Sequence, residues 1–214
     1  MLGGWYVVNL NYHLNQKFGL YGEVQARGQH LANDFYYHEL KAGASYNFSS
    51  SQSVFVGFGN YETYTFPGNF KKPVAVNENR IWEQFTMSHN ISRVKFEHRY
   101  RIEQRWLNGD YANRFRYRLA ATIPINNATI KTNTLFAFTF DELFFTDKPP
   151  YFLRNRIYGG LGFQFSKHIT LQSGFIRQYD YRTTDNGSGK NFIQTSLIIN
   201  AGNGEKAAHH ANAD

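Results

Sequence analysis

Residues 94–106 have the sequence VKFEHRYRIEQRW, in which two kinds of side chain alternate without a break. One set is mostly apolar or aromatic and includes Val94, Phe96 and Ile102. Every member of the other set, from Lys95 to Arg105, is charged. A period of two places alternate side chains on opposite faces of a β-strand, whereas a helix would need a period of 3.6. The stretch therefore predicts a strand with one fully charged face.

The same alternation continues through most of the chain. In residues 113–123, three arginines alternate with Phe115, Tyr117 and Leu119. Similar patterns cover residues 5–14, 18–27, 35–48, 53–64, 79–88, 130–145, 153–165, 169–181 and 191–200. The faces of 53–64, 79–88 and 130–145 are ambiguous, and Phe136, Phe138 and Phe140 followed by Glu142 indicate a bulge or a change of face. We expect an all-β chain with about eleven recognisable strands.

The links between these segments alternate between two kinds. Tight links are expected at 15–17, 49–52, 90–92, 126–128 and 166–168, and longer ones at 28–34, 65–78, 107–112, 146–152 and 182–190. The longer links contain turn and breaker residues such as Asn108-Gly109 and Pro149-Pro150. Short turns on one rim and longer loops on the other are typical of outer-membrane barrels.

Composition agrees with this architecture. Of the 214 residues, 18% are aromatic, with 15 Tyr and 20 Phe, and such residues favour strands and membrane interfaces. No stretch approaches the roughly 18 consecutive apolar residues of a membrane-spanning helix, but a barrel strand needs only about 9–11 residues with alternate positions facing lipid. The chain has no cysteine, so a disulfide or thiolate metal site is excluded.

The direction of the charged face decides between a soluble and a membrane barrel. In a soluble barrel the apolar face turns inward, and many tyrosine hydroxyls would then need partners in a dry core. If the apolar face turns outward, aromatic residues near strand ends form an interfacial belt with wet polar tips. The expected belt residues are Trp5, Trp82, Trp106, Tyr64, Tyr111, Phe144, Phe145 and Tyr151. We therefore expect the inverted arrangement.

The interior of such a barrel would hold a network of charges. A barrel of this size has little spare width, so cross-strand pairs of arginine and glutamate should fill much of it. The expected network consists of Glu23, Arg27, Glu39, Lys41, Glu97, Arg99, Arg101, Glu103, Arg105, Arg114, Arg116, Arg118, Glu142, Arg154 and Arg156, joined by Lys95 and Asp180. The net charge of +7 is thus spread over several strands, which argues against nucleic acid as a partner.

An even strand number is the norm for bacterial single-chain barrels. We therefore predict a single antiparallel up-and-down transmembrane barrel of about 12 strands over residues 1–201, with 10 as the fallback. Residues 202–214 are small and polar and are expected to be a disordered tail. Met1 to Trp5 is not a secretory signal peptide, so we expect the sequence to be a mature or trimmed form.

A set of motifs occurs in a characteristic order along the chain. It begins with Gly4-Trp5-Tyr6, continues through Arg80-x-Trp82-x-Gln84 and the arginine strands, and ends with Gly174-Phe175-x-x-Gln178-Tyr179. In this order the motifs, over about residues 4–200, resemble the domain-of-unknown-function 2490 family of predicted bacterial outer-membrane barrels. The resemblance implies an envelope barrel, and it implies no established activity, catalytic residue or cofactor.

Patterns for catalysis and metal binding are weak. There is no G-x-S-x-G motif, His38, His98 and Ser173 fall on the outward set, and His13 has no serine near it in sequence. Carboxylate pairs such as Glu97 with Glu103 are better explained by charge pairing than by glycoside chemistry. No metal-binding spacing of histidines occurs. Glycines at 57–59 and 159–162 lie within strands, where they are expected to make room for a large neighbour such as arginine.

The leading functional hypothesis is a non-enzymatic protein of the Gram-negative outer membrane. It would be a structural or accessory envelope component, or a porin-like, narrow, anion-leaning pore, because enclosed arginines favour anions. The expected partners are outer-membrane lipid, lipopolysaccharide and an envelope protein complex. A lipid-modifying enzyme and a soluble ligand-binding barrel remain as alternatives.

Overall fold

A computed structural model describes residues 1–65, 68–184 and 187–202, and these residues form a closed β-barrel of eleven strands. Within this part of the chain no helix is long and apolar enough to cross a membrane. The strands are β1 (Leu2–His13), β2 (Phe18–Gly28), β3 (Phe35–Asn47), β4 (Gln52–Tyr64), β5 (Val74–Ile91), β6 (Val94–Leu107), β7 (Asp110–Pro124), β8 (Thr134–Phe145), β9 (Phe152–Gln164), β10 (Ile169–Asp180) and β11 (Ser188–Gly202).

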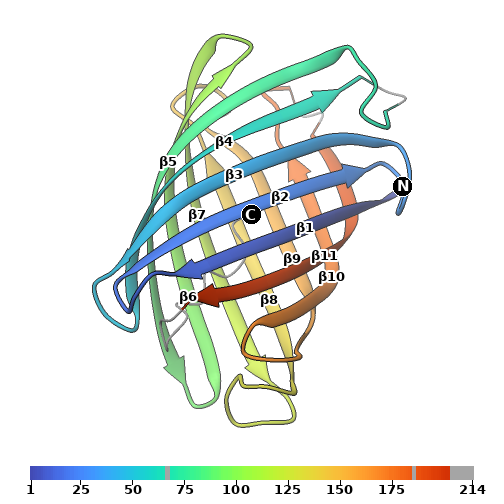
Figure 1. The fold of residues 1–214 in the computed structure, drawn as a ribbon. Helices are drawn as coiled ribbons and strands as arrows, with labels where there is room; N and C mark the ends of the chain where they lie inside the picture. The colour runs from blue at the N-terminus through green and yellow to red at the C-terminus, as the bar shows by residue number, and fades with distance from the viewer. Residues whose placement is uncertain (66–67, 185–186, 203–214) are drawn as a thin grey trace.

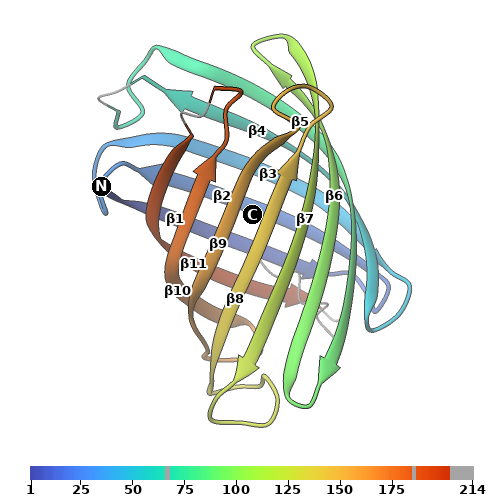
Figure 2. The same cartoon turned by 180° about the vertical axis from the view of Figure 1, so that it is seen from behind.

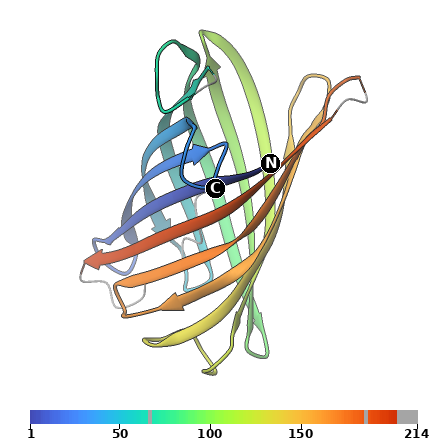
Figure 3. The same ribbon diagram turned by 90° about the vertical axis from the view of Figure 1, so that its right-hand side faces the viewer.

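Each strand pairs with its neighbours in sequence, and the barrel closes between the two ends of the chain (Figure 1). Strands β1 and β11 are parallel, from Leu2↔Asn191 to His13↔Gly202, whereas all other pairs are antiparallel. Figure 3 shows the dark-blue and red ribbons of these two strands side by side. The predictions of 12 strands and of a purely antiparallel barrel were therefore wrong. An odd number of alternating strands leaves the first and last running in the same direction, and a parallel ladder joins them.

The links gather at two rims. The turn rim contains the links after β1, β3, β5, β7 and β9, and the loop rim contains those after β2, β4, β6, β8 and β10. The predicted lengths of two links, 107–112 and 126–128, were wrong. Asn108 and Gly109, with φ of 49° and 99°, form a two-residue hairpin on the loop rim, because positive φ at both positions suits a tight type I′ turn. Residues 125–133 form a long link on the turn rim instead of a tight one.

Alternate side chains point into the barrel and out of it along every strand. In β1, Val7, Asn9 and Asn11 are buried, whereas Tyr6, Val8 and Leu10 are exposed. The side chains around the outside are mainly Leu, Val, Ile, Phe and Tyr, and many are about half exposed. The guanidinium groups of Arg99, Arg101, Arg116 and Arg118, in contrast, lie inside. The inverted arrangement expected from the sequence is the one that the barrel has.

Some aromatic residues lie on the opposite side of the wall from the one expected. Trp5, Trp82 and Phe144 were assigned to an outer belt, but each is 0% exposed and lies inside the barrel. The register between β8 and its neighbours is regular past Phe140, and its one irregularity occurs at Phe144/Phe145. The predicted bulge or change of face before Glu142 was therefore wrong, and Phe136, Phe138 and Phe140 point inward with it.

Glycines in the strands make room for these inward rings. A Cβ at Gly57 would lie 2.3 Å from the indole of Trp82, and one at Gly162 would lie 2.3 Å from the ring of Phe136. Both positions lie within strands, as expected, but the large neighbour is an aromatic ring rather than an arginine. The expected tail falls largely on residues 203–214, which lie outside the described part of the chain.

Candidate functional site

The inward side chains of β5, β6 and β7 form a wall of charges, which we call the charged wall. Arginines at positions 99, 101, 105, 114, 116 and 118 face the interior from β6 and β7, beside Glu97 and Glu103. Each strand contributes a row because consecutive inward residues are two apart. The arginines of the two strands oppose each other directly, as in Arg99↔Arg118 and Arg101↔Arg116. Such like-charged pairs require carboxylates nearby.

Two glutamates, Glu103 and Glu142, pair with most of these arginines. Glu103 accepts hydrogen bonds from Arg114 Nε and Arg116 Nη1, each at 2.7 Å. Glu142, on β8, accepts from Arg116 Nε at 3.0 Å and also contacts Arg99. Both glutamates are 0% exposed. A buried carboxylate shared by several guanidinium groups holds strands β6 to β8 in one register.

A second group of charges lies on β2 and β3. Lys41 Nζ lies 2.6 Å from Glu23 Oε1 and also contacts Glu39, so one ammonium joins two carboxylates. Arg27 lies 3.6 Å from Glu39, and its guanidinium stacks 3.5 Å from the ring centre of Trp5. The indole of Trp5 donates to Gln25 at 2.7 Å. The inward position of Trp5 is therefore satisfied by polar and cation–π contacts together.

Among the buried charged residues of the described ranges, sequence reasoning missed Glu78 and Arg80. Glu78 pairs with Arg80 at 2.6 Å and also with Arg105, and the Arg80 guanidinium lies 3.5 Å from the ring centre of Tyr61. The period of two from Glu78 through Trp82 to Gln84 was the available signal. It was obscured because the outward residues of this strand include the charged Glu83.

A cluster of mainly apolar side chains fills another part of the interior, among polar neighbours. Buried residues of β1 and β7 to β11 pack together here, and Figure 2 shows β8 on the wall that faces β2 and β3. Phe140 and Tyr158 stack with their ring planes 6° apart, and Phe138 lies 5.7 Å from Tyr158. This aromatic cluster consists of Trp5, Val7, Ala120, Phe136, Phe138, Phe140, Tyr158, Ile176 and Phe192. The interior is therefore not filled by charge pairs alone.

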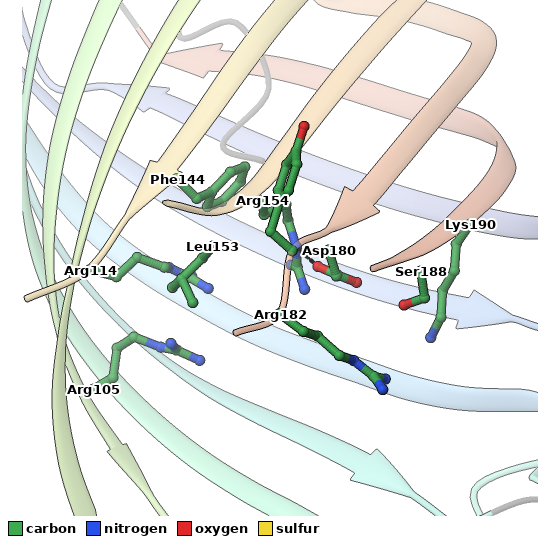
Figure 4. Close-up of a pocket in the computed structure, with 10 residues that line it drawn as sticks. Arg105, Arg114, Phe144, Leu153, Arg154, Asp180, Arg182, Ser188 and Lys190 are labelled. Carbon is green, nitrogen blue, oxygen red and sulfur yellow. Dashed lines mark hydrogen bonds and ion pairs between the residues drawn. The ribbon is translucent and has the colours of Figure 1, made fainter. Parts of the chain in front are cut away.

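A cavity of about 430 Å³ opens at the loop rim, and we call it the cationic cup. Arg154 and Asp180 form an ion pair in it, and Figure 4 shows Arg105 and Arg114 reaching toward them. A second cavity, of about 260 Å³, lies at the turn rim beneath the 125–133 link and is lined mostly by neutral side chains such as Gln172 and Phe138. Fully buried side chains, including Arg118 and Glu142, lie deeper in the barrel.

The network residues expected from sequence lie in four parts of the barrel interior. Glu23, Arg27, Glu39 and Lys41 lie together on β2 and β3, and residues 97–118 of the set form the charged wall with Glu142. Arg156 lies 3.8 Å from Glu142, whereas Arg154 pairs with Asp180 at the loop rim. Lys95 lines the turn-rim cavity. Arg105 and Arg154 are partly exposed, at 14% and 25% of their side chains.

The two outward histidines weighed for hydrolase chemistry have tyrosine partners. His38 and His98 each contact a tyrosine hydroxyl, Tyr64 at 3.0 Å and Tyr117 at 2.9 Å, and no described histidine ring is hydrogen-bonded to a serine hydroxyl. In the described ranges no group of three His, Cys, Asp or Glu side chains is placed to hold a metal ion. Asp147, on a loop, accepts from Asn113 at 3.0 Å, which lowers the pKa of its carboxyl.

Comparisons with known proteins give one match. No curated protein and no solved structure matches the chain. The sequence profile of a family described as "Protein of unknown function (DUF2490)" matches residues 2–189, which is most of the barrel. The chain therefore belongs to the DUF2490 family.

Proposed function

We propose that this protein is a non-enzymatic β-barrel of the bacterial outer membrane, with a closed interior and a structural or accessory role. The observation that carries the proposal is the inverted arrangement of the barrel, with apolar side chains outside and charged side chains inside. Leu40, Phe58 and Leu161 on the outside are 61%, 62% and 52% exposed, while the arginines are enclosed. Apolar surface costs about 25 cal/mol per Å² in water, so a mainly apolar exterior favours a hydrocarbon environment.

Exposed aromatic residues at both ends of the barrel also support a membrane environment. Trp106, Tyr111, Phe145 and Tyr151 are exposed at the loop rim, and Tyr12 and Phe48 are exposed near the turn rim. Aromatic residues of this kind are enriched where a barrel meets the membrane–water interface. A soluble barrel has no corresponding reason to expose rings at both of its ends.

The packed interior favours a structural or accessory role over the narrow pore. A pore needs a continuous water path, whereas the charged wall and the aromatic cluster bring fully buried side chains such as Arg118 and Tyr158 toward the middle of the barrel. Moving them would break buried ion pairs, which costs several kcal/mol. We therefore expect no steady conductance.

Refolding into lipid vesicles tests the proposal. The folded protein should stay with the vesicles after an alkaline wash and should migrate differently on a gel before and after boiling. A monomer that remains folded in the aqueous fraction without detergent would contradict the membrane location and support a soluble ligand-binding barrel. Single-channel recording in planar bilayers is the second measurement. A steady anion-selective current would contradict the closed interior.

A further inference from the structure

We propose that the cationic cup at the loop rim binds a small ligand through phosphate groups that carry at least two negative charges. Its lining comes from the loop-rim ends of six strands, β6 to β11, and the residues next to them (Figure 4). The side chain of Phe144 in this lining is fully buried. This proposal depends only on the geometry of the cup. It would stand even if the barrel were not in a membrane.

Two arginines of the cup have free donor groups. The hydrogen bonds of Arg105 to Glu78 and of Arg154 to Asp180 both leave from Nε. Among the described residues, the terminal amino groups of these two guanidiniums make no further hydrogen bond. A guanidinium can use its terminal groups to bind an anion while Nε stays in its ion pair. These arginines are therefore held in place and still available.

Two further cations have no acidic partner in the described ranges. Arg182 and Lys190 both line the cup, and Asp180, the one carboxylate among the described residues of its lining, is already paired with Arg154. Lys190 lies 5.3 Å from the ring centre of Tyr36. The side chains of Arg182 and Lys190 are both exposed, so they can turn toward a ligand. The cup therefore has at least two positive charges that a bound anion would neutralise.

The bottom of the cup is rigid. Arg114 donates to Glu103 Oε2 through Nε at 2.7 Å and also contacts the same oxygen through Nη2, so two nitrogens of this guanidinium are fixed by one carboxylate oxygen. The ring of Phe144 is fully buried and lies 5.3 Å from the Arg114 guanidinium. A fixed floor with exposed cations above it allows a ligand to be held without repacking the barrel.

The direction of the donors favours phosphate over a carboxylate. Arg105 enters from β6, Arg154 from β9 and Lys190 from β11, so the donors converge from different sides of the barrel. A phosphate presents acceptor oxygens in several directions, whereas a carboxylate presents two oxygens in one plane. The turn-rim cavity has no such convergence, because neutral Asn, Gln, Thr and Phe side chains dominate its lining.

Calorimetric titration of the folded protein in detergent with inorganic pyrophosphate tests this proposal. The double variant Arg182→Gln, Lys190→Gln removes the two cations for which the described residues provide no acidic partner. It should lower the affinity about tenfold or more, since a hydrogen bond to a charged group contributes about 1.5–3 kcal/mol. The matched control Lys17→Gln, Lys167→Gln removes the same charge from exposed positions on the turn rim and should leave the affinity unchanged.

The proposal is overturned if the wild-type protein binds no pyrophosphate at about 0.1 M salt, where long-range charge attraction is largely screened. Equal affinities of the two double variants would overturn it as well, because binding would then reflect net charge alone. A competition arm with lipopolysaccharide identifies the source of the phosphate. Displacement assigns a lipid headgroup, and retention of pyrophosphate assigns a soluble phosphate ester.

Discussion

The charged wall and the aromatic cluster fill two sides of the same barrel in different ways. On the charged wall, Glu103 and Glu142 bind several arginines each, and removing one carboxylate would leave more than one guanidinium buried without its partner. In the aromatic cluster, rings such as Phe138 and Tyr158 contact several equivalent neighbours. A buried ion pair does not tolerate the loss of one partner, whereas the stabilisation from ring packing is distributed over many contacts. The two sides should therefore respond very differently to substitution.

The largest effect is expected at Glu142. The change Glu142→Gln keeps the shape but removes the charge that faces Arg99, Arg116 and Arg156. Leaving buried guanidiniums without a charged partner should lower the free energy of unfolding by about 3–5 kcal/mol. Urea unfolding of the vesicle-embedded protein measures the loss.

The adjacent acid provides the control for this change. Asp141 points outward from the same strand and is exposed, with Asn155 as its partner. Asp141→Asn should not lower the free energy of unfolding, because it leaves no buried guanidinium without a partner and removes a charge from the outer face. Equal losses for both variants would contradict the account of the charged wall.

A somewhat smaller effect is expected outside the barrel, at Leu40. This residue precedes the enclosed Lys41, so the change Leu40→Lys compares the same cation on the two faces of β3. In a bilayer the outward lysine should lower the free energy of unfolding by about 2–4 kcal/mol. Leu31→Lys, on the exposed 29–34 link, should cost at most about 1 kcal/mol because it lies near the interface. A harmless lysine at position 40 would argue against surrounding lipid.

The smallest effect is expected in the aromatic cluster. Phe138→Leu removes ring contacts with Phe140 and Tyr158, whose centres lie 6.0 and 5.7 Å away. Since each aromatic pair contributes about 0.5–1.5 kcal/mol, the loss should be about 1–2 kcal/mol. Phe58→Leu, on the exposed outer face, serves as the control and should be nearly neutral. A loss at position 138 as large as that of Glu142→Gln would remove the difference between the two sides.

Much of this arrangement could be predicted from the sequence. The period of two identified the strands, and the uninterrupted charged row on β6 identified the inward face of the charged wall. The aromatic cluster was missed because outward and inward apolar residues look alike in sequence. Phe136 to Phe140 alternate with Ala137 and Thr139, and nothing local shows which set faces the interior.

Closure and link lengths depend on three-dimensional geometry that the sequence does not show directly. The parity rule led to twelve strands because pairing between Leu2–His13 and Ser188–Gly202 has no local signature. The Asn108-Gly109 hairpin, by contrast, had a clear turn signal, and its short length could have been predicted from that dipeptide. Residues 125–133 follow a strand that ends at Pro124, and only tertiary packing reveals that Ile130 contacts the aromatic cluster.

The surroundings of the outer face are the central question, and spin-label accessibility measures them directly. The chain has no cysteine, so single labels can be placed at Phe58→Cys and Leu161→Cys on two outer faces, with Leu31→Cys on the loop rim as the control. In vesicles, labels at 58 and 161 should be relaxed more by dissolved oxygen than by a water-soluble nickel complex, and the label at 31 should show the reverse. Stronger relaxation by the nickel complex at 58 and 161 would contradict a lipid-facing exterior.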